Sequence, residues 1–196
     1  MYQLVHNEVM ARPMTFDRAH ALDRALKLFW RQGYTATSLA QLLETMDIGR
    51  SSFYAAFGDK RSLFIEVLEL FGDRTRQMLE DVADINEPLL SIQRFFENTT
   101  FHVPNWRTDA GCMMVNTILE LADVDNELCQ LASRKLQQVE DSFAELLRPS
   151  QAHPEAAAAI VMTLYKGIRV SSRSGASQQE LQQVISSTLS LLDKAA

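Results

Sequence analysis

The chain has 196 residues, of which 46% are hydrophobic, with a formal net charge of −6 and two cysteines, Cys112 and Cys129. A chain of this length can bury a core without disulfides, and the cysteines lack Cys-x-x-Cys or Cys/His spacing, which argues against a disulfide scaffold and a structural zinc site. The sequence has no apolar run near the roughly 18 residues that cross a bilayer, and its first residues lack the apolar stretch of a secretion signal. We therefore expect a cytoplasmic protein with no membrane partner.

Residues 1–14 carry no periodic pattern and predict a flexible N-terminal arm, in which Arg12 could reach a phosphate or the minor groove of DNA. Thr15 can cap a first helix that Gly33 would end. The buried stripe of that helix is expected to comprise Ala21, Leu22, Ala25, Leu28 and Phe29.

Residues 33–60 predict two short amphipathic helices separated by a turn at 47–49. The first carries apolar residues at helical spacing from Leu39 to Met46, and Thr37 or Ser38 can cap it. The second turns Phe53 and Phe57 inward and leaves small polar groups, one arginine and one tyrosine facing out. A major groove about 12 Å wide accepts such a surface, because no bulky apolar side chain keeps the backbone away from the base edges.

This outward placement predicts the residues that contact duplex DNA. Arg50 is the best candidate for a guanine edge, whereas Tyr54 and Lys60 suit phosphates. The full predicted set is Thr37, Ser38, Arg50, Ser51, Ser52, Tyr54 and Lys60.

The division of charge along the chain agrees with a DNA-binding N-terminus. Residues 1–60 carry seven Lys/Arg and six Asp/Glu, which gives +1 and leaves −7 for the rest. A DNA-binding surface needs local positive charge, and we expect Arg50, Lys60 and Arg61 to supply it around the second short helix.

The stretch from Thr15 to Leu63 resembles the N-terminal domain of the tetracycline-repressor (TetR/AcrR) family of bacterial transcriptional regulators. The matching segments are ALKLF at 25–29, GY at 33–34, TSL at 37–39, SFY at 52–54 and FGDK at 57–60. Gly49 and Ala56 depart from the family pattern, which often has a capping serine and a histidine there. The resemblance implies an all-α fold of about nine helices. A three-helix DNA-binding domain would be followed by a helical ligand-binding and dimerisation domain, and a small effector would release the protein from its operator.

The rest of the chain also reads as helices with short connections, so we expect a DNA-binding domain at 15–60 and a regulatory domain at 61–196. The helices are predicted at about 59–84, from Pro88 towards Pro104, at 111–121, from the cap Asp125 to Pro149, from Pro154, and from the capping box at 177–180.

The last two helices carry more apolar surface than one protomer covers, in a run of small and branched residues at 156–168 and a stripe from Leu181 to Leu192. This surface favours a four-helix interface across a two-fold axis. Completion of the monomer core is the alternative. A homodimer would place two recognition helices about 34–36 Å apart, on successive major grooves of a palindrome.

The effector of the regulatory domain is predicted to be a small apolar or electrophilic molecule. Cys112 follows Gly111 at a helix N-terminus, where free N–H groups stabilise a thiolate, so a redox, electrophile or soft-metal sensor based on Cys112 is the alternative mechanism. Against this stands burial of Cys112 as a small hydrophobe. The candidate pocket residues are Phe96, Trp106, Cys112, Met113, Asn116, Phe143 and Tyr165.

A helical cysteine enzyme is the competing class. Catalysis by Cys112 would need a base, and the sequence does not place His102 or His153 beside it. We predict no catalytic residues, no cofactor and no resident metal site.

Overall fold

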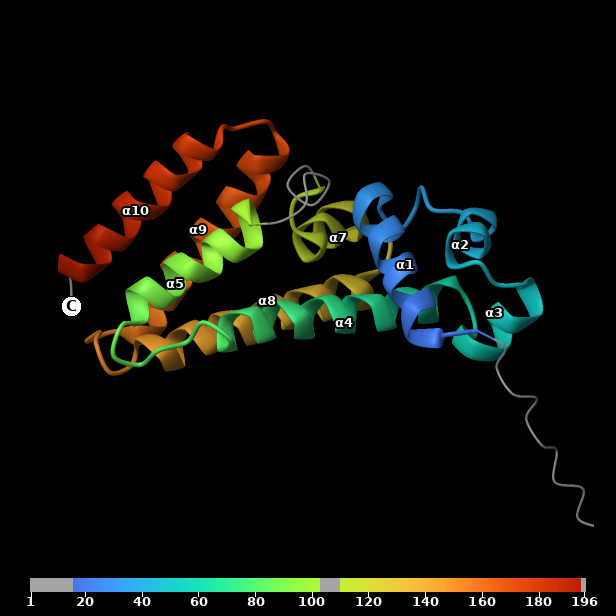
Figure 1. The fold of residues 1–196 in the computed structure, drawn as a ribbon, viewed down its shortest axis with the longest axis horizontal. Coiled ribbons are helices and arrows are strands. Elements are labelled where there is room, and N and C mark those ends of the chain that lie inside the picture. Colours follow the sequence, from blue (N-terminus) through green and yellow to red (C-terminus); the bar gives the residue numbers. More distant parts are fainter. Residues whose placement is uncertain (1–15, 103–109, 195–196) are drawn as a thin grey trace, which may run out of the picture.

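A computed structural model describes residues 16–102 and 110–194. In these two stretches the protein forms nine α-helices and one π-helical segment and has no strand, so the predicted all-α class is confirmed. No described helix is both long enough and apolar enough to cross a membrane. The molecule is elongated: α1–α3 lie at one end, α5, α9 and α10 lie at the other, and α4 and α8 run alongside each other between them (Figure 1).

The three N-terminal helices are α1 (Arg18–Gln32), α2 (Leu39–Met46) and α3 (Arg50–Phe57). Asp17 is the N-cap of α1, where its carboxylate accepts a hydrogen bond from the His20 N–H at 3.1 Å. The predicted cap at Thr15 is therefore wrong, because a carboxylate two residues further along takes that place. Thr15 and the predicted arm at 1–14 lie outside the described residues.

Two long helices connect the ends of the molecule, α4 (Lys60–Glu80) and α8 (Asn126–Leu147). Asp59 and Asp125 cap them. Helix α4 ends four residues before the predicted Asp84, because the Asp84 carboxylate accepts the Asn86 N–H and stabilises a turn instead.

Close packing of α4 on α8 depends on Gly72. A Cβ there would lie 2.6 Å from Cδ of Lys135, whose buried stem crosses α4 at this point and whose ammonium pairs with Asp73 and Glu69. A side chain at position 72 would therefore push the two long helices apart.

The remaining elements are α5 (Pro88–Phe96), the π-helical η1 (Glu97–Phe101), α7 (Met113–Leu121), α9 (Pro154–Arg173) and α10 (Gln178–Lys194). The predicted capping box at 177–180 is confirmed, since the Glu180 carboxylate accepts the Ser177 N–H at 2.8 Å and the Ser177 hydroxyl accepts the Glu180 N–H. Helix α7 begins two residues later than predicted, because Gly111 has a φ of +69° that no helix contains. The predicted helix end at Pro104 lies outside the described residues.

Candidate nucleic-acid interface

The turn between α2 and α3 is built from local hydrogen bonds. Ser38 caps α2 in a capping box with Gln41, each side chain accepting the other's backbone N–H. Asp47 ends α2 in the left-handed region at φ 57°, and Gly49 caps α3 without a side-chain bond. The pair of helices thus has the order and spacing predicted for a helix-turn-helix.

Helix α3 has one buried and one exposed face, as predicted. Phe53 and Phe57 are buried in the domain core, with their ring centroids 6.0 Å apart. Arg50 and Ser51 are exposed, Tyr54 is 47% exposed, and Ser52 is half-buried. The exposed face therefore presents the guanidinium of Arg50, serine hydroxyls and the phenol of Tyr54, and the two buried phenylalanines anchor the helix behind them.

Thr37 differs from this prediction. Its side chain is fully buried, and its hydroxyl donates to the Gly33 carbonyl at 2.6 Å. The prediction that Thr37 faces outward is wrong because Ser38 takes the capping position and turns Thr37 into the core between α1 and α2. Thr37 braces this loop, and Ser38 is the exposed member of the pair.

Lys60 and Arg61, at the start of α4, differ in how they are held. The Lys60 ammonium lies 4.4 Å from the centre of the Tyr34 ring, and partial burial lowers its pKa. Arg61 instead bonds Asp125 at 2.8 Å and Glu127 at 2.7 Å. Its expected place in the DNA-facing charge cluster is therefore wrong, because two carboxylates of the α8 N-terminus neutralise it.

Arg18 positions α3 and was not identified from the sequence. Its guanidinium donates to the Ala56 carbonyl at 3.1 Å and to Glu66, and lies 4.5 Å from the centre of the Phe57 ring. The carbonyl lies in the last turn of α3, where a cation is favourable. No local spacing could reveal a contact across 38 residues.

The same three-helix unit is tied to the rest of the chain by Glu120, at the end of α7. The Glu120 carboxylate accepts the backbone N–H groups of Tyr34 at 3.0 Å and Thr35 at 2.6 Å. Gly33 permits this approach: its φ is +85°, and a Cβ there would lie 2.5 Å from the carboxylate. The loop before α2 is thus held by a side chain of α7, which lies outside the three N-terminal helices.

A second tie runs through the carbonyl of Gly111, just before α7. It accepts a hydrogen bond from the Trp30 indole Nε1–H of α1 at 3.1 Å and another from the guanidinium of Arg169, on α9. A donor from α1 and a donor from α9 therefore converge on one acceptor.

The predicted effector residues fall into two groups. Phe96, Phe143 and Tyr165 are almost fully buried and pack with Phe95 in tilted and edge-on contacts, with centroids 5.3–6.2 Å apart. This aromatic contact fills space between α5, α8 and α9. Trp106 lies outside the described residues.

The second group lies at the start of α7. Cys112 lies at the N-terminus of α7, as predicted, although it is the N-cap and not a residue within the first turn; it is only 2% exposed, and Met113 beside it is also buried. The Asn116 amide donates to the Ala110 carbonyl at 2.8 Å. Cys129 is buried too, and burial raises the pKa of its thiol. Among the described residues, no group of three His, Cys, Asp or Glu could hold a metal ion.

Comparison with known proteins gives one consistent result. The model of the family described as "Bacterial regulatory proteins, tetR family" matches residues 21–67. The HTH-type transcriptional repressor ComR of Escherichia coli K12 is 31% identical over 190 residues, which cover 92% of this chain and 90% of the relative.

Solved structures extend the similarity to the fold. A cysteine mutant of the TetR-family regulator CifR, complexed with a 26-base-pair operator, is 26% identical with a TM-score of 0.71 and covers 93% of this chain and 100% of its own. The reduced form of Escherichia coli NemR has a TM-score of 0.74 at 18% identity, over 91% of this chain and 96% of its own.

Proposed function

The chain belongs to the tetR family of bacterial regulatory proteins, and on this premise we propose that it is a transcriptional repressor that binds a palindromic operator as a homodimer and leaves it when a small effector binds. The observation that carries the proposal is α3, whose exposed guanidinium, hydroxyls and phenol stand on two buried phenylalanines. Because the members of this family are transcriptional regulators, the chain is not the helical cysteine enzyme considered as an alternative. A protein that acts on the bacterial chromosome works in the cytoplasm, in agreement with the expected location.

Relatives support the DNA-binding part of the proposal. ComR is named a transcriptional repressor, and the CifR mutant is complexed with its operator. We assign the DNA contacts in this chain to Ser38, Arg50, Ser51, Ser52, Tyr54 and Lys60. Thr37 and Arg18 would not touch DNA; they hold the loop before α2 and the end of α3 in place. The functional division into a DNA-binding unit at 15–60 and a regulatory unit at 61–196 is part of the proposal.

The homodimer is supported by apolar side chains left exposed on the last two helices. Val184 and Leu191 are exposed on α10, the latter by 68%, and Ile160 and Val170 are exposed on α9. Gly167 lies among them, and a Cβ there would meet nothing within 4 Å. A second copy, related by a two-fold axis, would cover this face in a four-helix contact.

Release by an effector is supported by the ties that join the DNA-binding unit to the regulatory unit. Glu120 holds the loop before α2, and Arg61, which directly follows the DNA-binding unit, joins the start of α4 to the start of α8. A shift of α7 or α8 in the regulatory half would therefore move the frame that carries α3. Since coupling of two sites is reciprocal, operator should weaken effector binding by the factor by which effector weakens operator binding.

The direct test is a nuclease footprint of the wild-type protein on the DNA flanking its own gene. The proposal expects two protected half-sites whose centres lie about one helical turn, 10–10.5 base pairs, or a multiple of it apart. Binding that protects no particular sequence across this region would remove the proposed function.

A further inference from the structure

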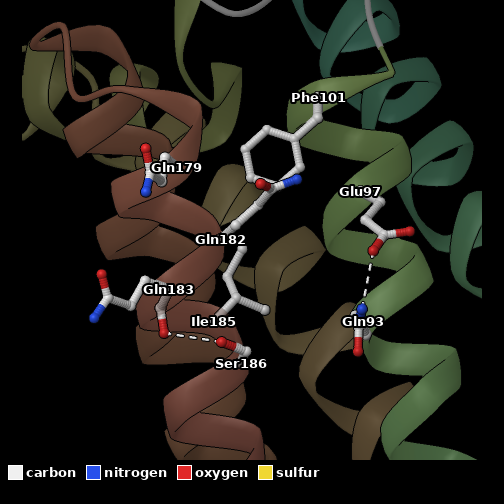
Figure 2. A pocket seen from close by; sticks show the side chains of 8 residues that line it. All are labelled: Gln93, Glu97, Phe101, Gln179, Gln182, Gln183, Ile185 and Ser186. Carbon is white, nitrogen blue, oxygen red and sulfur yellow. Dashed lines mark hydrogen bonds between the residues drawn. The ribbon is translucent and has the colours of Figure 1, made fainter.

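A groove separates α10 from α5 and η1, with a cavity volume of about 430 Å³, within the range of sites that take drug-sized ligands. Figure 2 shows Phe101 and Ile185 in its middle, Gln182 beside them, and Gln93 and Glu97 along the opposite helix. Among the described lining residues four are glutamines and Glu97 is the only charged one. The groove thus combines a small apolar floor with a rim of amide groups.

The groove is bordered by the π-helical turn of η1. The His102 N–H donates to the Glu97 carbonyl five residues back, at 2.9 Å, and this wider turn carries Phe101 towards α10 (Figure 2). Single π turns are uncommon and are frequently found at functional sites. The π-helical turn η1 therefore forms part of the wall of the groove.

The groove also stays accessible in the proposed dimer. Successive residues of a helix are rotated by about 100°, so Ser186 and Gln182 lie roughly 160–200° from Val184 around α10. Val184 and Leu191 belong to the apolar face that a second copy would cover, whereas Ser186 and Gln182 line the groove. Pairing through the apolar face leaves the other side of α10 open.

We propose that this groove is the effector site, and that its ligand is a small uncharged molecule rich in hydroxyl or amide groups with one apolar edge. An amide side chain both donates and accepts hydrogen bonds, which matches hydroxyl and amide groups of a ligand. An anion would meet the Glu97 carboxylate with no cation among the described lining residues to balance it, and a wholly apolar molecule would displace water from the exposed glutamine amides without replacing its hydrogen bonds. The inference rests on the proposed function, because it names the ligand class and position of that effector.

A chain of contacts leads from the groove to the DNA-binding unit. Arg169, fully buried on α9, donates to the Thr99 carbonyl of η1 at 2.7 Å and also to the Gly111 carbonyl. The same Gly111 carbonyl oxygen accepts a hydrogen bond from the indole N–H of Trp30, on α1. A ligand that moves η1 therefore moves the partner of Arg169, and the shared carbonyl passes the change to α1.

The experiment occupies the groove covalently. Ser186→Cys is modified with a glucose-bearing methanethiosulfonate, which forms a mixed disulfide and releases methanesulfinate, and affinity for the footprinted operator is compared before and after. Ser190→Cys, one turn further along α10 at an exposed serine outside the groove, is the matched control, and treated wild type controls for the two native thiols. Gln182→Cys repeats the test from a second position in the groove.

We expect the groove adduct to weaken operator binding about fivefold or more, within the usual range of allosteric coupling, and the two controls to change little. Trp30→Phe keeps an aromatic ring but loses the indole N–H. In a protein that combines it with Ser186→Cys, the adduct should weaken operator binding by a smaller factor. The assignment of the site is wrong if modification leaves operator affinity unchanged in both groove variants. It is also wrong if modified Ser190→Cys loses as much operator affinity as the modified groove variants. An unmodified protein that shows no footprint would instead remove the proposed function.

The ligand class is tested on the same variant with a sulfonatoethyl methanethiosulfonate. The uncharged glucose adduct should raise the Tm of Ser186→Cys, whereas the anionic adduct beside Glu97 should lower it. A higher Tm for the anionic adduct would contradict the assigned class.

Discussion

At the scale of single residues, Thr37 is expected to stabilise the DNA-binding unit without contacting DNA. Its buried hydroxyl bonds the Gly33 carbonyl, so Thr37→Val should cost about 0.5–1.5 kcal/mol of unfolding free energy and leave base preference unchanged. Urea unfolding measures the first effect, and operator variants measure the second. A variant of wild-type stability with altered base preference would place Thr37 in the reading surface after all.

Lys60 is expected to act on the phosphate backbone. Lys60→Ala should weaken binding to specific and unrelated duplexes alike and reduce the slope of log K against log salt by about one, because one fewer counterion is released. Lys27→Ala is the control, since that lysine lies on α1 and is already paired with Asp23 at 2.8 Å. A loss confined to the operator would show that Lys60 reads bases.

At the scale of elements, the joint between α4 and α8 depends on the ionisation of Asp125. The hydrogen bond from Arg61 holds the pKa of this carboxyl below its ordinary value. A depressed folded pKa stabilises the protein above the unfolded pKa of about 3.9, and the contribution is lost as the pH falls towards the folded value.

Asp125→Asn should therefore lower the Tm at neutral pH, and the difference from wild type should shrink below about pH 4. Asparagine can still cap α8, so the change reports the ion pair rather than the cap. Asp123→Asn, at an exposed neighbour, serves as the control. A Tm difference that does not vary with pH would show that the pair with Arg61 contributes nothing.

The elements whose signals are local could be predicted from the sequence. The caps at Asp125 and Ser177 were identified, and the α2 cap was narrowed to Thr37 or Ser38, because side chain and backbone partner lie within three residues. The π turn of η1 was missed, since Glu97 to Phe101 continue an ordinary helical pattern. The roles of Arg18 and Arg61 could not be predicted, because their partners lie 38 to 66 residues away.

At the scale of the whole molecule, the apolar face of α9 and α10 determines assembly. Val184→Asp should convert the dimer to a monomer, because a carboxylate would be buried without a partner at the contact. Leu119→Asp changes an exposed apolar residue on α7 and should leave the mass unchanged. Sedimentation equilibrium measures both. A Val184→Asp protein that remains dimeric would place the interface elsewhere.

The central claim is that two copies of α3 read a two-fold DNA sequence, and selection of random duplexes by wild type and by Arg50→Ala tests it most directly. We predict that wild type selects an inverted repeat and that Arg50→Ala selects the same spacing with one degenerate base pair in each half, at a cost of about 1–3 kcal/mol per bidentate contact. Selection of no inverted repeat by wild type, or of an identical sequence by the variant, would contradict the account.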